Sequence, residues 1–342
     1  MLQGALLGFG NMGEAVAKRM AEFKDARIAT VFDPGAERRA VAESLGLKAV
    51  AKLDDAFASR IDFALVVSPN RFHCEQVLAA VQAGAHVYCE KPLALNLDEC
   101  DRMVAAVEAA RRVNVVNFSI RYSGAGRVMK RLVDDGALGE LLTFWRIRSR
   151  GYGLFTAGAR HPAVVDPAAS GGWTMHHMCH DIDALYWLCG AYKKVWSLSR
   201  STVPGGASEE LIWTLAELER AGQTVRPTAM IGDAVHRMHF EEEGASGSAG
   251  TMRRVLRDGR EMILLQPEGG EPGLRSGAGR ALPEREFPTA DAAEPGGGLG
   301  HFFDCLVSGK ASQVTFRDAR AAVAVARACQ QSARAGGQPI DL

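Results

Sequence analysis

The sequence predicts an α/β protein in two parts: first a doubly wound parallel sheet, then an α/β domain with a large open, mainly antiparallel sheet. Three observations carry this prediction. Apolar runs and helical stretches alternate as far as residue 120, which is the pattern of parallel strands joined by helices. Beyond residue 140 the runs are short and alternate apolar with polar residues, as antiparallel strands do. The length of 342 residues also exceeds what one hydrophobic core usually serves.

The first predicted strand, residues 4–7, runs into a glycine-rich turn. Gly8, Gly10 and Gly13 follow the spacing GxGxxG, and residues 14–23 then have helix-forming composition. In a strand–turn–helix unit such glycines permit a tight turn, close approach of a pyrophosphate and close packing of the helix on the strand. The phosphates then lie at the helix N-terminus. This pattern is typical of a Rossmann domain that binds a dinucleotide.

A carboxylate follows the second predicted strand. Residues 28–32 end in Asp33, twenty residues after Gly13, where a carboxylate can accept hydrogen bonds from an adenosine ribose. An acidic side chain there favours NAD over NADP, because it repels a 2′-phosphate. Arg38 and Arg39 could contact such a phosphate, but their position is more typical of a solvated helix face.

Polar side chains follow the next two apolar runs. The run 63–67 is followed by Ser-Pro-Asn and then by a helix that opens at His73, which could touch the cofactor, although a histidine in a first helical turn is more often structural. The run 85–88 is followed by Glu-Lys-Pro. Pro92 lacks the N–H that a continued central strand needs, so Lys91 should lie at the strand's carboxyl end. Open α/β sheets bind their ligands at that edge.

A helix over 98–111 and a strand over 113–118 complete this domain, and we place the domain boundary at residue 120. The predicted cofactor contacts lie in the turns that follow strands. They are Gly8, Gly10, Asn11, Met12, Gly13, Asp33, Ser68, Pro69, Asn70, His73, Glu90 and Lys91.

The second predicted domain, 121–342, begins with a helix over 121–138. The runs predicted to form its sheet are 141–147, 195–201, 211–218, 228–231, 237–241 and 262–265. The Gly- and Pro-rich segment 268–298 predicts a long loop system. Helices over 302–307 and 318–334 follow, and the last could pack back on the first domain.

Three histidines and two aspartates lie within eight residues that follow a Gly-Gly pair. If this stretch opens a helix, His176, His180 and Asp183 share one face. His177 and Asp181 form a neighbouring face. Three interpretations stay open: polar residues at a helix start, an acid/base site in which a histidine exchanges a hydroxyl proton, and a metal site with His176, His180 and Asp183 as ligands.

Together these motifs resemble the Gfo/Idh/MocA family of NAD(P)-dependent oxidoreductases. The resemblance rests on the glycine turn, Ser68-Pro69-Asn70 with His73, Glu90-Lys91-Pro92, Gly171-Gly172 leading to His180 and Asp183, and more weakly on residues 328–333. It implies a Rossmann domain followed by an α/β domain whose open sheet often makes dimer or tetramer contacts. It also implies that Lys91 stabilises a developing alkoxide and that His180 exchanges the hydroxyl proton.

The chain departs from the family's pattern at two positions. Many members have an aspartate four residues before the catalytic histidine and a glycine two before it, where this chain has His176 and Met178. His176 could therefore serve as the general base, or bind a metal together with His180. The side chains expected to contact substrate are Lys91, Tyr152, Arg160, His177 and Asp183.

The leading hypothesis is an NAD-dependent oxidoreductase that transfers a hydride between nicotinamide and a carbon-bound hydroxyl of a sugar, an inositol or a related cyclic diol. One alternative, suggested by His176, is a lyase or glycosidase that uses NAD for transient oxidation and elimination, with or without a divalent metal. A second alternative is a non-catalytic NAD-binding sensor. The presence of both Lys91 and His180 argues against it.

Composition narrows the expected partners. Forty basic and forty acidic residues give a formal net charge of zero, so no overall field attracts nucleic acid or an anionic membrane. We expect no membrane span, because no apolar run reaches about 18 residues. We also expect no signal peptide, because the first residues contain no basic segment followed by a longer apolar run and a cleavage site. The seven cysteines lack CxxC spacing, as expected of reduced thiols in the cytoplasm. The prediction is a cytoplasmic homodimer or homotetramer with a small polyhydroxylated substrate.

Overall fold

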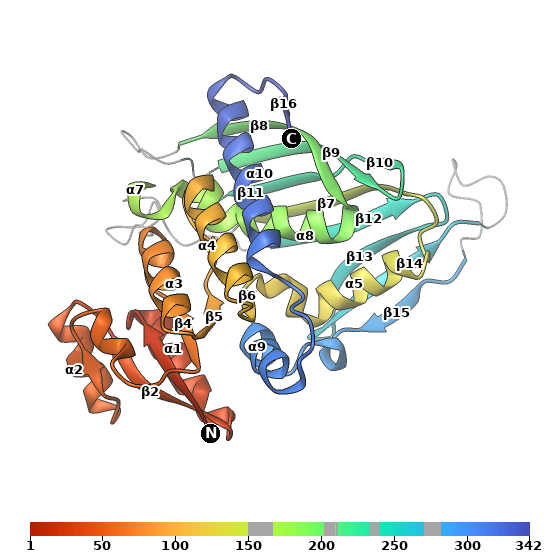
Figure 1. Cartoon of the computed structure of the whole chain (residues 1–342). Helices are drawn as coiled ribbons and strands as arrows, with labels where there is room; N and C mark the ends of the chain where they lie inside the picture. Colours follow the sequence, from red (N-terminus) through yellow and green to blue (C-terminus); the bar gives the residue numbers. More distant parts are fainter. Residues whose placement is uncertain (150–166, 202–208, 210, 233–239, 270–281) are drawn as a thin grey trace, which may run out of the picture. The chain divides into compact units, whose positions relative to one another are not determined.

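The computed structural model describes residues 1–149, 167–201, 209, 211–232, 240–269 and 282–342. These residues form two compact units, each built on one sheet (Figure 1). The first unit contains residues 1–118, 169–171 and 298–323, and the second contains the remaining described residues. No helix within the described residues combines the length and the hydrophobicity needed to cross a bilayer.

The first unit has a six-stranded parallel sheet in the order β3-β2-β1-β4-β5-β6, which confirms the predicted doubly wound sheet. Its strands are β1 (Leu2–Leu7), β2 (Ala26–Phe32), β3 (Ala49–Val50), β4 (Phe63–Val66), β5 (His86–Cys89) and β6 (Asn114–Val116). Because β1 lies between β2 and β4, the strand order reverses there. Sheets of this kind bind ligands at the carboxyl ends of the strands beside that reversal.

Helices connect these strands as the sequence predicts. They are α1 (Asn11–Arg19), α2 (Ala36–Ser44), α3 (His73–Gln82) and α4 (Leu97–Ala109), with 3-10 turns η1 (Met20–Glu22), η2 (Asp54–Phe57) and η3 (Asn70–Phe72). The Asn96 side chain caps α4 by accepting a hydrogen bond from the backbone N–H of Glu99, which satisfies a donor that the first turn leaves open.

Two segments from late in the chain join the first unit. They are α9 (Gly297–Ser308), from residue 298 on, and the first turns of α10 (Phe316–Arg334), as far as residue 323. The rings of Phe302 and Phe303 pack edge-on against Phe63 of β4, with centroids 6.2 and 5.1 Å away. The core of this unit therefore depends on residues more than two hundred positions apart.

The second unit has a ten-stranded sheet in the order β15-β14-β13-β12-β7-β11-β9-β8-β16, with β10 paired to β9. Among its described pairings only β7 with β11 is parallel, so the sheet is mainly antiparallel, as predicted. Its strands are β7 (Leu141–Ser149), β8 (Ala191–Arg200), β9 (Leu211–Arg220), β10 (Gln223–Val225), β11 (Thr228–Gly232), β12 (Phe240–Gly247), β13 (Gly250–Arg257), β14 (Arg260–Pro267), β15 (Arg285–Pro288) and β16 (Ile340–Asp341).

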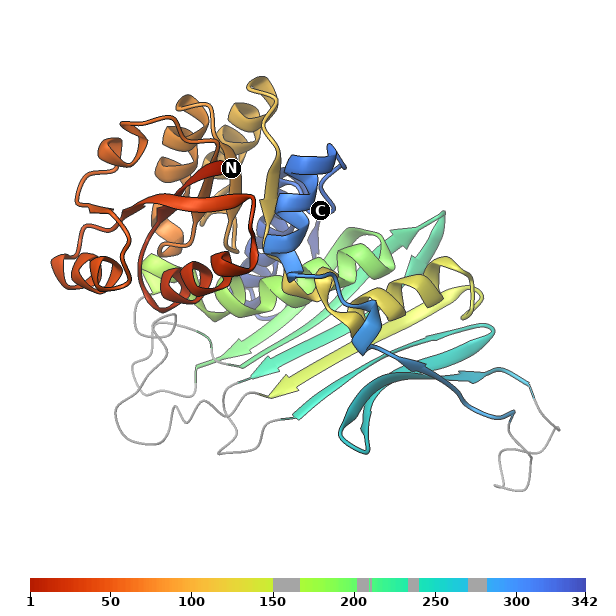
Figure 2. The same ribbon diagram turned by 90° about the horizontal axis from the view of Figure 1, so that it is seen from below.

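The helices of this unit gather on one face of its sheet. That face is covered by α5 (Gly124–Asp134) and α8 (Cys179–Cys189), yellow and green in Figure 2. Along β9 the residues that face the helices are buried, whereas Trp213 and Leu215 on the opposite face are 44% and 59% exposed. Within the described part of the chain, no helix lies on that opposite face.

Several predictions about local structure are wrong. The helix predicted over 121–138 is a 3-10 turn, η4 (Ser119–Tyr122), followed by α5, which ends at Asp134. The segment predicted as loop, 268–298, contains β15, a 3-10 turn η7 (Ala290–Ala292) and the start of α9. Strand β13 was missed because three arginines interrupt its apolar alternation, and its strand conformation depends on pairing with β12 and β14. Of the predicted strand 237–241, only the last two residues lie in the described part, in β12.

Candidate functional site

The glycine turn after β1 is shaped by close contacts at two of its three glycines. Gly8 has φ of 97°, and a Cβ there would lie 2.7 Å from Cα of Ser68. A Cβ on Gly13 would lie 2.3 Å from the carbonyl oxygen of Gly8. At Gly10, by contrast, no atom lies within 4 Å of where a Cβ would stand. The turn itself thus requires Gly8 and Gly13, whereas Gly10 leaves the backbone open to a ligand.

Asp33, the residue after β2, is held against this turn. Its Oδ2 accepts a hydrogen bond from the N–H of Phe9 (2.7 Å), and its Oδ1 accepts one from the N–H of Gly35 (2.8 Å). The guanidinium of Arg39 donates to the carbonyl oxygens of Asp33 (3.0 Å) and Pro34 (2.8 Å). Arg39 therefore stabilises the loop after β2. The carboxylate of Asp33 lies beside the glycine turn, where the backbone at Gly10 is open.

His73, at the start of α3, links the loops that follow β4 and β5. Its ring is fully buried, with Nδ1 2.9 Å from the carbonyl oxygen of Pro92 and Nε2 3.0 Å from that of Ser68. Burial lowers the pKa of His73, although the carbonyl groups of Ser68, Pro92 and Leu93 oppose that shift. The imidazole is thus neutral near pH 7 and fixes the loop that carries Lys91. Its role as a cofactor contact stays a prediction.

The Glu-Lys-Pro stretch lies directly after β5. Glu90 is 8% exposed, and its Oε1 accepts a hydrogen bond from Nδ2 of Asn117 (2.8 Å), the residue after β6. Burial raises the pKa of Glu90, against the opposing influence of Lys91 and Asn117. Lys91 is half-buried. Asn117 was not among the predicted site residues, although its position after an apolar strand, like that of Ser68, is a usable signal.

Asn70 is also engaged within the first unit. Its Nδ2 donates to the carbonyl oxygen of Ser170 (2.9 Å), a contact between residues one hundred positions apart. Gly171 and Gly172 follow, both with φ of 82°, a left-handed conformation that glycine adopts without strain. The left-handed backbone conformation just before the histidine stretch thus requires glycine at both positions.

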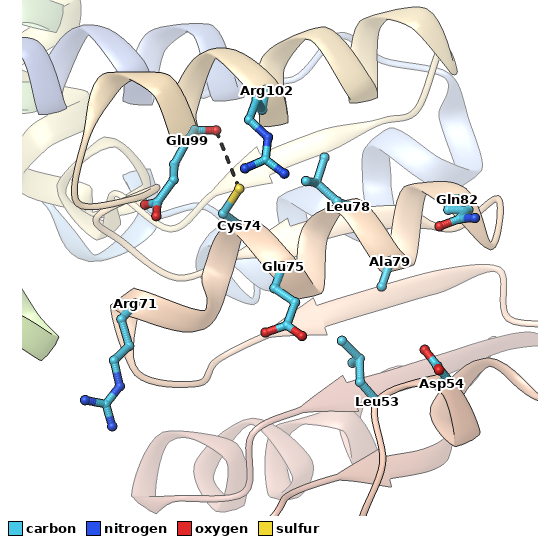
Figure 3. Close-up of a pocket in the computed structure, with 10 residues that line it drawn as sticks. All are labelled: Leu53, Asp54, Arg71, Cys74, Glu75, Leu78, Ala79, Gln82, Glu99 and Arg102. Carbon is cyan, nitrogen blue, oxygen red and sulfur yellow. Dashed lines mark hydrogen bonds between the residues drawn. The ribbon is translucent and has the colours of Figure 1, made fainter.

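A cleft of about 410 Å³ lies along α3 in the first unit (Figure 3). Ten side chains line it: Leu53, Asp54, Arg71, Cys74, Glu75, Leu78, Ala79, Gln82, Glu99 and Arg102. In one wall of the cleft, the thiol of Cys74 donates a hydrogen bond to the carbonyl oxygen of Glu99, with 3.8 Å between sulfur and oxygen. None of the predicted cofactor contacts lines this cleft, so it neither supports nor opposes the dinucleotide site at the glycine turn.

In the second unit the histidine stretch starts as a π-helix turn, η5 (Thr174–Met178), and continues as α8. The prediction of a regular helix is therefore wrong for the turn that contains His176, whereas His180 and Asp183 lie three residues apart in α8, a spacing that places both on one face. A π turn is wider than an α-helical turn and bonds residues five apart, so the i, i+4 argument does not apply to His176.

Aromatic rings pack closely in this turn. Trp173 is fully buried, and its ring centroid lies 4.0 Å from that of His177. The rings of His176 and His177 meet edge to face at 4.8 Å. His177, a predicted substrate contact, is 8% exposed, so its ring contributes to the packing of the turn.

Asp183 forms a buried ion pair with Arg121 of η4. Nη2 of Arg121 lies 2.6 Å from Oδ1, and Nε lies 2.9 Å from Oδ2. No sequence pattern indicated this partner, and the pair uses both carboxylate oxygens of Asp183, a predicted substrate contact. Among the residues that the structure describes, no group of three or more His, Cys, Asp or Glu side chains is arranged to hold a metal ion.

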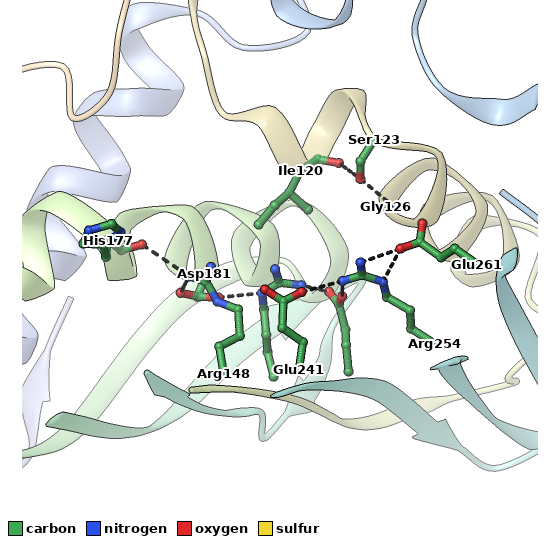
Figure 4. A network of polar contacts seen from close by, with 11 residues as sticks. Ile120, Ser123, Gly126, Arg148, His177, Asp181, Glu241, Arg254 and Glu261 are labelled. Atoms are coloured by element: carbon green, nitrogen blue, oxygen red, sulfur yellow. Dashed lines mark hydrogen bonds and ion pairs between the residues drawn. The ribbon is translucent and has the colours of Figure 1, made fainter. Parts of the chain in front are cut away.

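A ladder of charged side chains, buried at one end and partly exposed at the other, runs along the inner face of the second sheet, the face that α5 and α8 cover (Figure 4). Asp181 accepts from Nε of Arg146 (2.5 Å) and from Nη2 of Arg148, and Arg146 pairs in turn with Glu243. Burial opposes the charged form of Arg146, but Glu243 and Asp181 outweigh it and raise the pKa of the guanidinium. The ladder then continues through Arg254 to Glu241 and Glu261, both within hydrogen-bond distance.

Arg148, the residue before the last of β7, belongs to this ladder. It is 2% exposed, and its guanidinium is directed at Asp181 of α8. Tyr152 and Arg160, two of the predicted substrate contacts, lie outside the described residues.

Known proteins match both units. The model of an oxidoreductase family with an NAD-binding Rossmann fold matches residues 2–118, and that of the Gfo/Idh/MocA C-terminal domain matches residues 127–248. Inositol 2-dehydrogenase 3 of Saccharopolyspora erythraea is 34% identical over 187 residues, 54% of this chain and 52% of that protein. A 2,7-anhydro-N-acetylneuraminate hydratase of Mediterraneibacter gnavus is 29% identical over 187 residues, 54% of this chain and 49% of that protein. The aligned segments thus span about half of each relative.

The fold also matches solved structures over its full length. A levoglucosan dehydrogenase in complex with NADH and levoglucosan superposes with a TM-score of 0.84 at 20% sequence identity, covering 99% of both chains. At this identity the match supports the fold alone.

Proposed function

Because the chain belongs to the Gfo/Idh/MocA oxidoreductase family, we propose that it is an NAD-dependent oxidoreductase that acts on a CH–OH group of a sugar, an inositol or a related cyclic diol. The observation that carries the proposal is the position of Lys91, directly after β5. Parallel strands end at one edge of a sheet, so Lys91 shares that edge with the glycine turn after β1 and with Asp33 after β2. The inositol dehydrogenase among the relatives supports this substrate class.

The first unit fits a dinucleotide. The backbone at Gly10 is open, and the carboxylate of Asp33 lies beside it, where it favours NAD over NADP. When bound, NAD supplies the hydride acceptor. The predicted contacts after β4 and β5, including Ser68 and Glu90, lie at the same sheet edge and remain part of the proposal.

Lys91 and His180 carry the chemistry in this proposal. A carbon gives up a hydride only as its hydroxyl loses a proton, so a cation and a base beside that oxygen lower the barrier. The ammonium of Lys91 donates a hydrogen bond to the oxygen and stabilises its developing charge. The imidazole of His180 accepts the proton, with His176 as the alternative base. Lys91 and His177 would also contact the substrate, whereas Asp183 holds α8 through its pair with Arg121.

A second candidate function is a lyase or glycosidase in which NAD oxidises the substrate transiently and elimination follows. Two observations favour it: the hydratases among the relatives, and His176 in place of the aspartate that many family members carry. Both candidates need the same cofactor and Lys91. They differ in whether reduced cofactor accumulates.

The test is a panel of cyclic polyols, sugars and anhydro-sugars, incubated with the purified protein and NAD. The nucleotide content is measured first, by release on denaturation and mass determination. An oxidoreductase forms NADH in step with a ketone product. A transient oxidation cleaves or hydrates the substrate while NADH stays below the enzyme concentration. Binding of NAD without conversion of any compound would support the sensor alternative and overturn the proposal.

We also propose that the chain forms a homodimer or homotetramer through the open face of the second sheet. Leu198 of β8 and Trp213 of β9 are cross-strand neighbours there, and both are largely exposed, as is Leu215. Contiguous exposed apolar side chains of this kind mark interaction sites. Trp213→Glu should shift the mass in light scattering to that of a monomer. An unchanged mass would contradict the proposal.

A cytoplasmic setting is part of the same proposal. All seven cysteines are free thiols and all are buried, which suits a reducing compartment. The balanced charge gives no reason to expect nucleic acid or membrane partners.

A further inference from the structure

We propose that Arg148 and Asp181 are positioning residues for His180: from the inner face of the second sheet they fix the π turn and the first turn of α8. The inference rests on the proposed role of His180 as the proton acceptor. It assigns a function to a buried ion pair that would otherwise count only towards the packing of the unit.

One guanidinium nitrogen contacts the chain on both sides of His180, at a backbone carbonyl before it and at a side-chain carboxylate after it. Nη2 of Arg148 donates to Oδ2 of Asp181 and lies 3.4 Å from the carbonyl oxygen of His177 (Figure 4). His177 is the last but one residue of the π turn and Asp181 lies in the first turn of α8. His180 lies between these two anchors, so the junction from which its side chain projects is fixed at both ends.

A second arginine, Arg146, also pairs with the carboxylate of Asp181. Arg146 and Arg148 are two residues apart in β7 and therefore point to the same face of the sheet. Nε of Arg146 lies 2.5 Å from Oδ1 of Asp181, so each oxygen of the carboxylate has its own guanidinium. All three side chains are at most 4% exposed. Water does not compete for these hydrogen bonds, and the planar guanidinium makes them directional.

These contacts to Asp181 matter for catalysis because the turn before α8 is a π turn. A single π turn departs from the helical geometry that the chain would otherwise adopt, and π turns occur frequently at functional sites. Relaxation of this turn towards α-helical spacing would rotate and shift the start of α8. A displacement of about 1 Å in a catalytic group can reduce turnover by about 100-fold.

The experiment compares Arg148→Met and Arg148→Lys with Arg254→Met as the matched control. Arg254 belongs to the same ladder, but its ion pairs go to Glu241, Glu243 and Glu261, and none of these is in α8 or the π turn. Two quantities are measured: amide hydrogen exchange of residues 174–182, and steady-state kinetics with NAD affinity.

We expect Arg148→Met to speed exchange in residues 174–182 by about tenfold or more, the effect of losing a hydrogen bond to a charged group. Its kcat should fall by about 100-fold while KM and NAD affinity stay near those of the wild type, and Arg148→Lys should recover part of the loss. Arg254→Met should leave both the exchange and kcat close to wild type, even if it lowers Tm as much.

Equal exchange in Arg148→Met and wild type would overturn the inference, as would a loss of kcat of the same size in Arg254→Met. If the wild type converts no compound in the panel, the proposed function fails separately. Hydrogen exchange then decides the inference alone: faster exchange confined to residues 174–182 in Arg148→Met supports it, and unchanged exchange overturns it.

Discussion

The two units hold their functional side chains by different physical means. At the edge of the first sheet, main-chain groups make most of the contacts that hold the site. Gly8 and Gly13 permit close approaches between backbone segments, and the side chains of His73 and Asp33 form hydrogen bonds with main-chain groups. On the inner face of the second sheet, buried charges on distant elements hold α8 in place. The difference predicts that the stability of the first unit is sensitive to backbone changes at the glycine turn, and that the stability of the second unit is sensitive to the loss of buried charge.

The origin of the contrast lies in sequence distance. The glycine turn and Asp33 are local features of two neighbouring strands, and each can be fixed by short-range geometry. The charge ladder joins β7, α8, β12 and β13, so that Arg146 meets Asp181 and Glu243 only after the sheet has formed. A site assembled in this way depends on the whole unit.

The largest expected effect tests the proposed chemistry of the first unit. Lys91→Met should lower kcat by about 10²- to 10³-fold, because the developing charge on the substrate oxygen loses its stabilising donor. Tm should change little, since Lys91 is only half-buried. Steady-state kinetics on an identified substrate and thermal unfolding give the two numbers. Arg71→Met, a change of equal charge on the cleft along α3, is the control, and near-normal turnover in Lys91→Met would contradict the assignment.

The second prediction tests whether the second unit depends on buried charge. Asp181→Asn removes the carboxylate that pairs with Arg148 and one of the two that pair with Arg146, and breaking a buried pair in this way costs about 3–5 kcal/mol of unfolding free energy. Urea denaturation measures the loss. Asp101→Asn, which breaks an exposed pair with Arg320, should cause little change because solvent screens that pair. Equal effects of the two substitutions would remove the contrast between the units.

The third prediction separates fold from cofactor at the glycine turn. Gly13→Ala places a Cβ against the carbonyl oxygen of Gly8 and should lower the unfolding free energy by about 1–3 kcal/mol. Gly10→Ala meets no protein atom, so it should leave stability unchanged and weaken NAD binding. Calorimetric titration with NAD and urea denaturation of both variants provide the comparison. A loss of stability in Gly10→Ala equal to that in Gly13→Ala would show that this space is not reserved for a ligand.

The smallest expected effect concerns pH. Burial lowers the pKa of His73, so the unfolded chain binds a proton there more readily than the folded protein does. Stability from this group is therefore complete above the unfolded pKa of about 6.5 and is lost as the pH falls below it. His73→Gln should show a shallower loss of unfolding free energy than wild type below about pH 6.5.

Denaturation in urea at a series of pH values measures this slope. His86, whose pKa burial and Arg112 also lower, is retained in the variant and leaves part of the dependence in place. Identical slopes in His73→Gln and wild type would mean that the buried imidazole does not control this part of the pH dependence.

Residue patterns alone predicted the class of both sheets and the strand ends of the first unit. Its apolar runs alternate with helices, its glycines follow a spacing that backbone geometry requires, and Asp33 and Lys91 each follow a strand. All of these are short-range patterns, because a period, a turn or a strand end is encoded within about ten residues.

How the histidine stretch is held could be seen only in the folded protein. Three features of that stretch depend on residues that lie far from it in sequence. They are the π turn at His176, the ion pair of Asp183 and the two ion pairs of Asp181. Likewise, the sequence placed His73 correctly at a helix start but could not show that its ring joins two loops. Such contacts depend on which strands become neighbours in the sheet. The residues of a strand determine which of its faces is buried far more strongly than they determine which strand pairs with it.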